Sequence, residues 1–505
     1  MINRGKRASG ILLPVFSLPS RYGIGTFGKA AYAFVDWLKD AKQSFWQILP
    51  LCMTSYGDSP YQSFSTFAGN PYFIDLEPFI EEGLLTRACC SRMDWGKSPQ
   101  YVDYEKQYKN RYRLLRKAYS KSLHREKPEY SDFLKQQSVW LDDFCLYMSL
   151  KQRFNQHSWL DWPENYKFRR MEAMDEARHE LQDEMDFQRF LQYTFFKQWF
   201  SLKEYANRQG IKIIGDLPIY VAMDSADAWV NPKLFQFDER LNPTHVAGVP
   251  PDYFSEDGQL WGNPLYNWPA HKATDYEWWI RRIAHTASLY DTVRIDHFRG
   301  FAEYWAVPYG SKTARKGKWN KGPGAKLFAE LKHCIGETDI IAEDLGVRSR
   351  GLDILLKKTG YPGMKVLQFA FSAGQDSLFL PHNYPKECIV YTGTHDNATT
   401  LEWYKELLPD DKKFVNQYCR VPENADFPVF SMIETAFQSI AELVIIPLQD
   451  YLLLGAEARI NIPSTLGGNW TWRLLPKQLD KSLQKKIAAM TKIYFRDRSA
   501  DVEQQ

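Results

Sequence analysis

The sequence predicts an α/β protein of the (β/α)8 TIM barrel class, with long helical and loop-rich insertions between its strands. Eight short runs are apolar on both faces, which is typical of parallel strands covered by helices. Helix-like patterns separate most of these runs, and such an alternation favours a barrel. The expected strands are residues 10–16, 46–51, 211–221, 292–298, 339–345, 364–371, 388–393 and 458–462.

The helices are expected in the stretches between these runs. Residues 183–209 place most of their aromatic side chains on one helical stripe, and Gly210 suits a helix end. Such a stripe is far more typical of a packing face than of a ligand site. Residues 324–334 and 399–408 also have a helical pattern.

The chain is longer than a bare barrel requires. A barrel of this class takes roughly 250 residues, whereas this chain has 505. We expect most of the excess in two insertions, a mostly helical one at residues 52–210 and a loop-rich cap at 222–290. Residues 1–505 are then a single barrel domain without a C-terminal β-sandwich, because too few residues follow the last expected strand.

Composition excludes several classes of partner. A net charge of +3 with no long basic run argues against nucleic acid, and no apolar stretch is long enough for a membrane span. The seven cysteines include no Cys-x-x-Cys pair, so we expect neither disulfides nor a metal site. The apolar run after the basic start is short and broken by Pro14, so we expect no signal peptide and a cytoplasmic location.

Carboxylates stand at the ends of four expected strands. They are Asp216, Asp296, Glu343 and Asp396. A carboxylate is costly to place at the end of a buried strand, and barrels collect reactive groups at the carboxyl ends of their strands. We therefore expect these acids to converge on one site. Two carboxyl groups about 5 Å apart are what retaining glycosidic-bond chemistry requires.

The neighbours of two acids suggest opposite charge states. Arg294 and Asp296 share a face of one strand, so the guanidinium should lower the pKa of that carboxyl group. An apolar surround or the adjacent Asp344 would raise the pKa of Glu343, as a general acid requires.

Each acid also has a structural interpretation. Asp216 suits a turn or a helix cap, and Arg294 with Asp296 suits a structural ion pair. Glu343 suits a helix N-terminus, and residues 395–397 suit a capping cluster before the next helix. Their occurrence together, in order and at strand ends, favours the site.

Three segments resemble the signatures of the 4-α-glucanotransferases, which include bacterial amylomaltases and plant disproportionating enzymes and belong to the α-amylase clan. They are Arg-Ile-Asp-His-Phe-Arg-Gly-Phe at 294–301, Ile-Ala-Glu-Asp-Leu-Gly at 341–346 and Thr-Gly-Thr-His-Asp-Asn at 392–397. The resemblance extends from Gly10 to Arg473 through further matches at residues 59–63, 69–72, 215–221, 248–254 and 261–264.

The resemblance implies a role for each acid. Asp296 matches the nucleophile, Glu343 the acid/base, and Asp396 the acid that holds the 2- and 3-hydroxyls of the distorted sugar. Further substrate-binding residues implied by the motifs are Ser59, Tyr61, Asp216, Arg294, His297 and His395, with Tyr253, Phe254 and Trp261 in an aromatic acceptor loop and Tyr56 at a second glucan-binding surface.

The implied reaction moves a segment of an α-1,4-glucan to the 4-hydroxyl of another glucan or of glucose, by a retaining double displacement without a cofactor. Maltodextrins, fragments of starch or glycogen, and glucose are the expected partners. A glucan hydrolase of the α-amylase type is the alternative reaction. A non-catalytic glucan-binding protein is the alternative from another class, and the loss of an acid would indicate it, but all three acids are present.

One position departs from the family pattern. Ser464 stands where relatives usually have glycine. If that position needs a positive φ, serine carries backbone strain at the end of the last strand.

Overall fold

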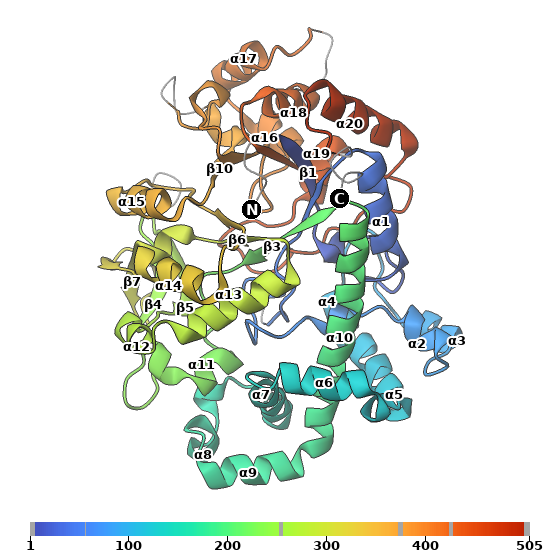
Figure 1. Ribbon diagram of the computed structural model, residues 1–505, viewed down its shortest axis with the longest axis vertical. Helices are drawn as coiled ribbons and strands as arrows, with labels where there is room; N and C mark the ends of the chain where they lie inside the picture. The colour runs from blue at the N-terminus through green and yellow to red at the C-terminus, as the bar shows by residue number, and fades with distance from the viewer. Residues whose placement is uncertain (1–5, 56, 252–255, 372–376, 424–427, 499–505) are drawn as a thin grey trace.

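Eight parallel strands close into a barrel in which each strand neighbours the next along the chain (Figure 1). The computed structural model describes residues 6–55, 57–251, 256–371, 377–423 and 428–498. The strands are β1 (Ala8–Leu12), β2 (Phe45–Gln47), β3 (Lys212–Leu217), β6 (Thr292–Ile295), β9 (Ile340–Ala342), β10 (Gly363–Val366), β11 (Cys388–Tyr391) and β12 (Leu443–Pro447). This confirms the predicted barrel.

Side chains fill the inside of the barrel. Its interior cluster consists of Ala8, Leu12, Phe45, Ile214, Ile341, Met364, Ile389, Tyr391, Leu443 and Ile445. A much larger apolar core lies between the strands and the helices around them. The barrel is therefore a packed core, which leaves no room for a ligand inside it.

The eighth strand is not where the sequence analysis placed it. Residues 458–462 form the end of a 3-10 turn and an irregular segment, and the closing strand is β12. All five residues of β12 are buried, and the strand pairs with both β1 and β11. Residues 458–462 alternate apolar side chains with Arg459 and Asn461, which bond to Glu402 and Asp396. A central strand has no room for such partners.

Helices surround the barrel (Figure 1). Those packed outside it are α1 (Lys29–Asp40), α13 (Glu277–Leu289), α14 (Ala325–Ile335), α15 (Arg350–Thr359), α18 (Val429–Gln438) and α20 (Lys481–Ile493). Short helices α16 (Thr400–Glu406), α17 (Pro409–Tyr418) and α19 (Leu448–Tyr451) follow β11 and β12. The expected helices at 324–334 and 399–408 correspond to α14 and α16.

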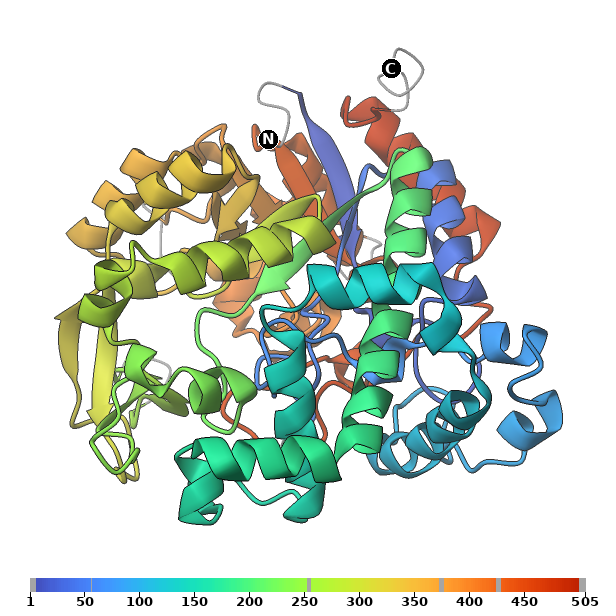
Figure 2. The ribbon, with the colours of Figure 1, turned by 60° about the horizontal axis from the view of Figure 1, so that its bottom comes forward.

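The chain between β2 and β3 forms a mostly helical layer at one end of the molecule (Figure 2). Its helices are α2 (Glu77–Glu81), α3 (Arg87–Ser91), α4 (Tyr104–Lys106), α5 (Tyr112–Lys121), α6 (Pro128–Gln136), α7 (Leu141–Arg153), α8 (Glu164–Lys167), α9 (Met171–Glu180) and α10 (Gln182–Arg208). The long α10 is the expected aromatic helix and ends before Gly210, whose φ is 79°. It runs from this layer to the barrel, where it contacts β3 and α1.

A second, antiparallel sheet, which was not predicted, lies beside the barrel (Figure 1). Its order is β5 (Gln259–Pro264), β4 (His245–Val249), β7 (Glu303–Pro308) and β8 (Lys318–Lys321). Helices α11 (Ala226–Val230) and α12 (Trp268–Ala273) flank β4 and β5 in the chain. Two separate segments thus build this sheet, one after β3 and one after β6.

No helix in the described part of the chain has the length and apolar character to cross a membrane.

Candidate active site

The four predicted acids lie in or just after strands whose carboxyl ends meet at one end of the barrel. Asp216 lies in β3 and pairs in register with Arg294 of β6. Asp296 follows β6, Glu343 follows β9, and Asp396 stands five residues after the end of β11. Strand β6 also pairs with β9, Ile295 opposite Ala342, so Asp296 and Glu343 leave neighbouring strands side by side.

A cavity of about 410 Å³ opens at this end of the barrel. Five of the predicted residues line it: Ser59, Tyr61, Trp261, Asp296 and Asp396. Its other lining residues are Gly57, Gln62, Pro218, Ile219, Tyr220, Gln259, Asn263, Asn461, Pro463, Ser464, Thr465, Leu466 and Trp470. Polar groups and aromatic rings around a strand-end cavity are typical of a ligand site.

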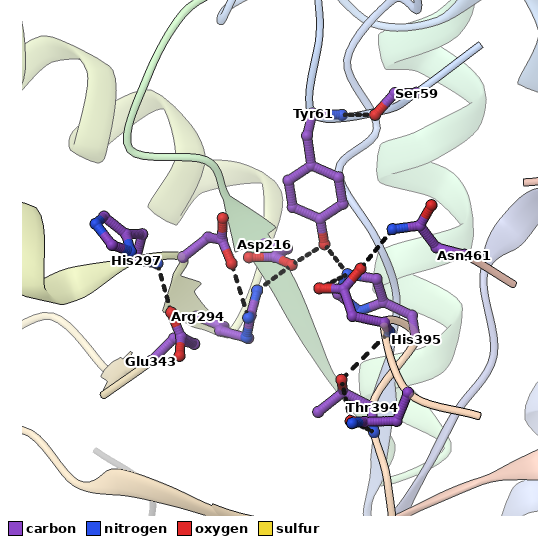
Figure 3. A network of polar contacts seen from close by, with 12 residues as sticks. Ser59, Tyr61, Asp216, Arg294, His297, Glu343, Thr394, His395 and Asn461 are labelled. Carbon is purple, nitrogen blue, oxygen red and sulfur yellow. Dashed lines mark hydrogen bonds and ion pairs between the residues drawn. The ribbon is translucent and has the colours of Figure 1, made fainter. Parts of the chain in front are cut away.

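Arg294 holds two of the acids in place (Figure 3). Its Nη1 donates to Asp216 Oδ2 at 2.6 Å, and its Nη2 donates to Asp296 Oδ1 at 2.8 Å. Arg294 is only 3% exposed; burial disfavours its charge, but the two carboxylates outweigh burial and raise its pKa well above the ordinary value. Asp296 therefore lies beside a permanent positive charge, a neighbour that suits a carboxylate nucleophile.

Glu343 has the environment of an acid that keeps its proton. Its Oε1 accepts the Leu345 N–H and its Oε2 accepts the His297 N–H, each at 2.8 Å. Burial, and next to it the negative charge of Asp296, raise the pKa of Glu343 to about 8. His297 directly follows Asp296, so the Glu343 carboxyl group is fixed to the segment that carries the other acid. The two acids therefore have different surroundings, a buried guanidinium beside Asp296 and backbone N–H groups around the buried Glu343.

His297 joins Glu343 to the aromatic wall of the cavity. Its ring meets Trp261 edge to face, with ring centroids 4.8 Å apart, and burial lowers the pKa of the imidazole to about 4. The backbone of His297 is left-handed, with φ 48°, which is uncommon for a non-glycine residue. This conformation aims the backbone N–H at Glu343 while the neutral ring packs on Trp261.

A second polar group contains His395 and Asn461 and reaches the first through Tyr61 (Figure 3). Asp396 belongs to this second group. The Tyr61 hydroxyl donates to Asp216 Oδ2 at 2.6 Å and lies 2.9 Å from His395 Nε2, and the two rings are stacked. His395 Nε2 is 3.3 Å from Asp396 Oδ2. Asn461 Nδ2 donates to Asp396 Oδ1 at 2.7 Å. Burial opposes the charge on Asp396, but His395 and Asn461 outweigh it and hold its pKa below the ordinary value.

Helix capping does not account for these acids. Ser349 caps α15 and Thr399 caps α16, so neither Glu343 nor Asp396 occupies a cap position. Asp216 lies within a strand, where its Oδ1 is buried without a hydrogen-bond partner. The side chains therefore meet at the cavity instead of ending helices.

The remaining predicted residues divide into two groups. Ser59 and Trp261 line the cavity, and Ser59 Oγ accepts the Tyr61 N–H at 3.2 Å. Tyr56, Tyr253 and Phe254 lie outside the described residues.

The loop after residue 460 contributes cavity residues that the sequence analysis missed. Asn461 and Trp470 line the cavity, and Asn461 also binds Asp396. This loop was not predicted because its first residues were assigned to the last strand. The sequence Gly-Gly-Asn at 467–469 is typical of a loop and could have indicated it. Ser464 in the same loop has φ 64°, which confirms that its position needs a left-handed backbone.

Across the described residues, no group of three or more His, Cys, Asp or Glu side chains is arranged to hold a metal ion.

Comparisons with known proteins agree with the geometry. A family model described as 4-alpha-glucanotransferase matches residues 13–478. The 4-alpha-glucanotransferase of Clostridium butyricum is 47% identical over 95% of this chain and 99% of its own length. A chloroplastic/amyloplastic 4-alpha-glucanotransferase of Arabidopsis thaliana is 42% identical over 93% of this chain and 82% of its own.

Solved structures show the same fold. The amylomaltase from Streptococcus agalactiae in complex with acarbose matches with a TM-score of 0.95 and 42% identity, covering 98% of this chain and all of the other. The amylomaltase from Corynebacterium glutamicum, at 18% identity, has a TM-score of 0.75 over 96% of this chain and 75% of its own length. The matched family model, the relatives and the barrel-end site agree, and the chain belongs to the 4-α-glucanotransferase family.

Proposed function

We propose that Asp296 and Glu343 carry the 4-α-glucanotransferase reaction of this chain, as nucleophile and acid/base of a retaining double displacement. The observation that supports this most is the opposed pair of environments. Asp296 is bound to a buried cation, whereas burial and a neighbouring charge raise the pKa of Glu343 to about 8. A retaining mechanism needs one ionised and one protonated carboxyl group on one sugar.

In the first half of the reaction, Glu343 gives its proton to the glycosidic oxygen while Asp296 attacks the anomeric carbon. The bond to the leaving glucan breaks, and an ester to Asp296 forms. Asp396 and His395 hold sugar hydroxyls more tightly as the ring flattens, which lowers the energy of the transition state.

In the second half, the 4-hydroxyl of an acceptor glucan attacks the esterified carbon and Glu343 takes its proton. Esterification removes the charge of Asp296, one cause of the raised pKa of Glu343. The same side chain therefore becomes a better base when a base is needed. Asp296 leaves as a carboxylate, and the number of glycosidic bonds is unchanged.

Both insertions contribute to this site, and we propose that residues 1–505 act as one catalytic unit. The 52–210 insertion supplies Ser59 and Tyr61, and the 222–290 insertion supplies Trp261 to the same cavity. We place acceptor binding near Trp261, where a ring can stack on the sugar and exclude water.

Linear α-1,4-glucans and glucose are the proposed substrates. Free thiols at all seven cysteines suit a reducing cytoplasm, where we propose that the chain works.

Maltotriose as the only substrate tests the proposal. Transfer predicts longer maltodextrins together with glucose, while the number of reducing ends stays constant. A hydrolase of the α-amylase type would give only shorter sugars, with reducing ends rising at each turnover. An unchanged maltotriose pool, with intact binding, would indicate a non-catalytic glucan-binding protein. Glu343→Gln is the control, because it removes the acid from an otherwise similar cavity.

A further inference from the structure

A buried carboxylate outside the cavity joins the two ends of the segment that carries His395 and Asp396. Asp450, in α19, is 1% exposed. Its Oδ2 accepts the hydroxyl of Thr392 at 2.6 Å and the hydroxyl of Thr400 at 2.7 Å. Its Oδ1 accepts the Thr400 N–H at 2.8 Å. Thr392 directly follows β11 and Thr400 begins α16, so one side chain fixes both ends of residues 393–399.

A neighbouring side chain supports the same segment from the other side. Gln368, which follows β10, donates from Nε2 to the Ala398 carbonyl at 3.0 Å, and its N–H bonds to the Thr392 carbonyl. Gly393 lies so close to Gln368 that an added Cβ would come within 2.7 Å of Nε2. Hydrogen bonds with Gln368, which follows β10, and with Asp450, which follows β12, thus fix the two ends of the segment.

Within the segment, the internal hydrogen bonds join residues of one short turn, Thr394 to Asn397, and do not attach this turn to the barrel. Asn397 Oδ1 accepts from the N–H and the hydroxyl of Thr394. No helix or strand forms between β11 and α16. The positions of His395 and Asp396 at the cavity therefore depend strongly on where the two ends are held.

A buried carboxylate with three donors is an orienting device. Burial raises the pKa of Asp450, and its three hydrogen-bond donors come from Thr392 and Thr400, at the two ends of one segment. Small displacements of groups that contact a transition state are costly, and a misplacement of about 1 Å can lower the rate by about a hundredfold.

We propose that Asp450 is a positioning residue of the transfer reaction, which acts through His395 and Asp396 by clamping both ends of residues 393–399. The proposal rests on the roles assigned above to His395 and Asp396. It places a determinant of catalysis in α19, outside the residues that line the cavity.

Asp450→Asn is the first test, because the amide keeps the shape but presents N–H groups to two hydroxyl donors. We expect kcat for maltotriose transfer to fall about ten- to a hundredfold with little change in KM. The reason is that the contacts of His395 and Asp396 with the sugar, which the change would weaken, strengthen in the transition state. Asp75→Asn is the matched control. Asp75 is also buried and accepts one threonine hydroxyl, Thr26, and one backbone N–H, Glu77, but neither partner belongs to residues 392–400 and Asp75 does not line the cavity.

The result that supports the proposal is a loss of kcat in Asp450→Asn that exceeds the loss in Asp75→Asn at a similar fall in Tm. Equal kcat losses in the two variants, or wild-type kcat in Asp450→Asn, would overturn it. If Asp450→Asn does not fold, Thr392→Val and Thr392→Ser decide. The valine variant should lose kcat and the serine variant, which keeps the hydroxyl, should retain it; equal kcat in both would overturn the proposal.

Asp396→Asn separates this inference from the proposed function. An inactive Asp396→Asn beside a fully active Asp450→Asn overturns the positioning role alone. A fully active Asp396→Asn overturns both the role of Asp396 and the positioning role that depends on it.

Discussion

Two carboxyl groups with opposite requirements lie on adjacent strands of this barrel. Arg294 binds Asp296 directly. Glu343 accepts hydrogen bonds from two backbone N–H groups, and the nearby charge of Asp296 disfavours its ionisation. Their roles can be separated experimentally. Whether the leaving group needs a proton depends on the donor substrate, whereas every donor needs the nucleophile.

The leaving group therefore distinguishes the acid from the nucleophile. Glu343→Gln should lower kcat with maltotriose by about 10²- to 10⁴-fold, the usual contribution of a general acid. A maltosyl fluoride donor needs no proton on its leaving group, so it should restore formation of the glycosyl-enzyme in this variant. Asp296→Asn should stay inactive with both donors. Steady-state rates and mass spectrometry of the trapped ester measure the two effects, and rescue of Asp296→Asn by the fluoride would reverse the assignment.

Glu343 should also make stability depend on pH. Its folded-state pKa of about 8 lies above the ordinary 4.5, so between these values the folded protein holds a proton that the unfolded chain has released. Rising pH then favours unfolding, and the penalty is complete above about pH 8. Glu343→Gln lacks this penalty. Its Tm should exceed that of the wild type by a margin that grows between pH 5 and pH 9. A margin that stays constant across this range in calorimetry would contradict the raised pKa.

At the scale of elements, the sequence predicted what strand periodicity and burial determine locally. Seven of the eight expected strands overlap strands of the barrel, because runs that are apolar on both faces have few other places in a fold. The acids at their ends followed directly from the strand positions. The eighth prediction was wrong because residues 458–462, with the polar Arg459 and Asn461, lie in a loop, whereas the closing strand is Leu443–Pro447, which is apolar throughout.

Local sequence patterns could not predict contacts between segments that are far apart in the chain. Asn461 binds Asp396 from a loop 65 residues further along the chain. The antiparallel sheet likewise pairs β4 with β7, which belong to different barrel connections. Neither pairing has a periodic signal in the sequence, so both emerge only when the barrel brings the segments together.

Ser464 offers a test of strain in the loop beside the cavity. A left-handed backbone costs a non-glycine residue about 1 kcal/mol or more, and glycine avoids this at the expense of a more flexible unfolded chain. Ser464→Gly should therefore raise the free energy of unfolding by up to about 1 kcal/mol. Ser464→Ala keeps the strain and should not be stabilised. Denaturant unfolding measures both variants, and an equal gain in alanine and glycine would show that the serine side chain, not φ, is the cause.

At the scale of the whole molecule, the helical layer must be held against the barrel for one cavity to receive residues from both. Lys151 of α7 makes one of these connections and is only 1% exposed. Its Nζ donates to Asp224 Oδ2 at 2.6 Å, in the connection after β3, and to the carbonyls of Gln156 and His157. Asp224 Oδ1 also accepts the Tyr147 hydroxyl at 2.7 Å.

Breaking this connection should loosen the helical layer before it disturbs the barrel. Asp224→Ala leaves the Lys151 ammonium buried without its counter-ion, which costs about 3–5 kcal/mol. Lys151→Met removes the charge as well as its bonds and should cost less, because Asp224, whose side chain is 30% exposed, keeps water and Tyr147 as partners.

The double variant Lys151→Met/Asp224→Ala should then lose less stability than the sum of the two single variants, because no unpaired charge remains. Thermal unfolding of all four proteins gives the coupling energy. Limited proteolysis shows where the molecule opens, and in Asp224→Ala we expect the first cuts between β2 and β3. Additive losses, or first cuts within the barrel, would mean that this ion pair does not hold the layer in place. The cavity would then depend on the apolar packing of α10 against the barrel instead.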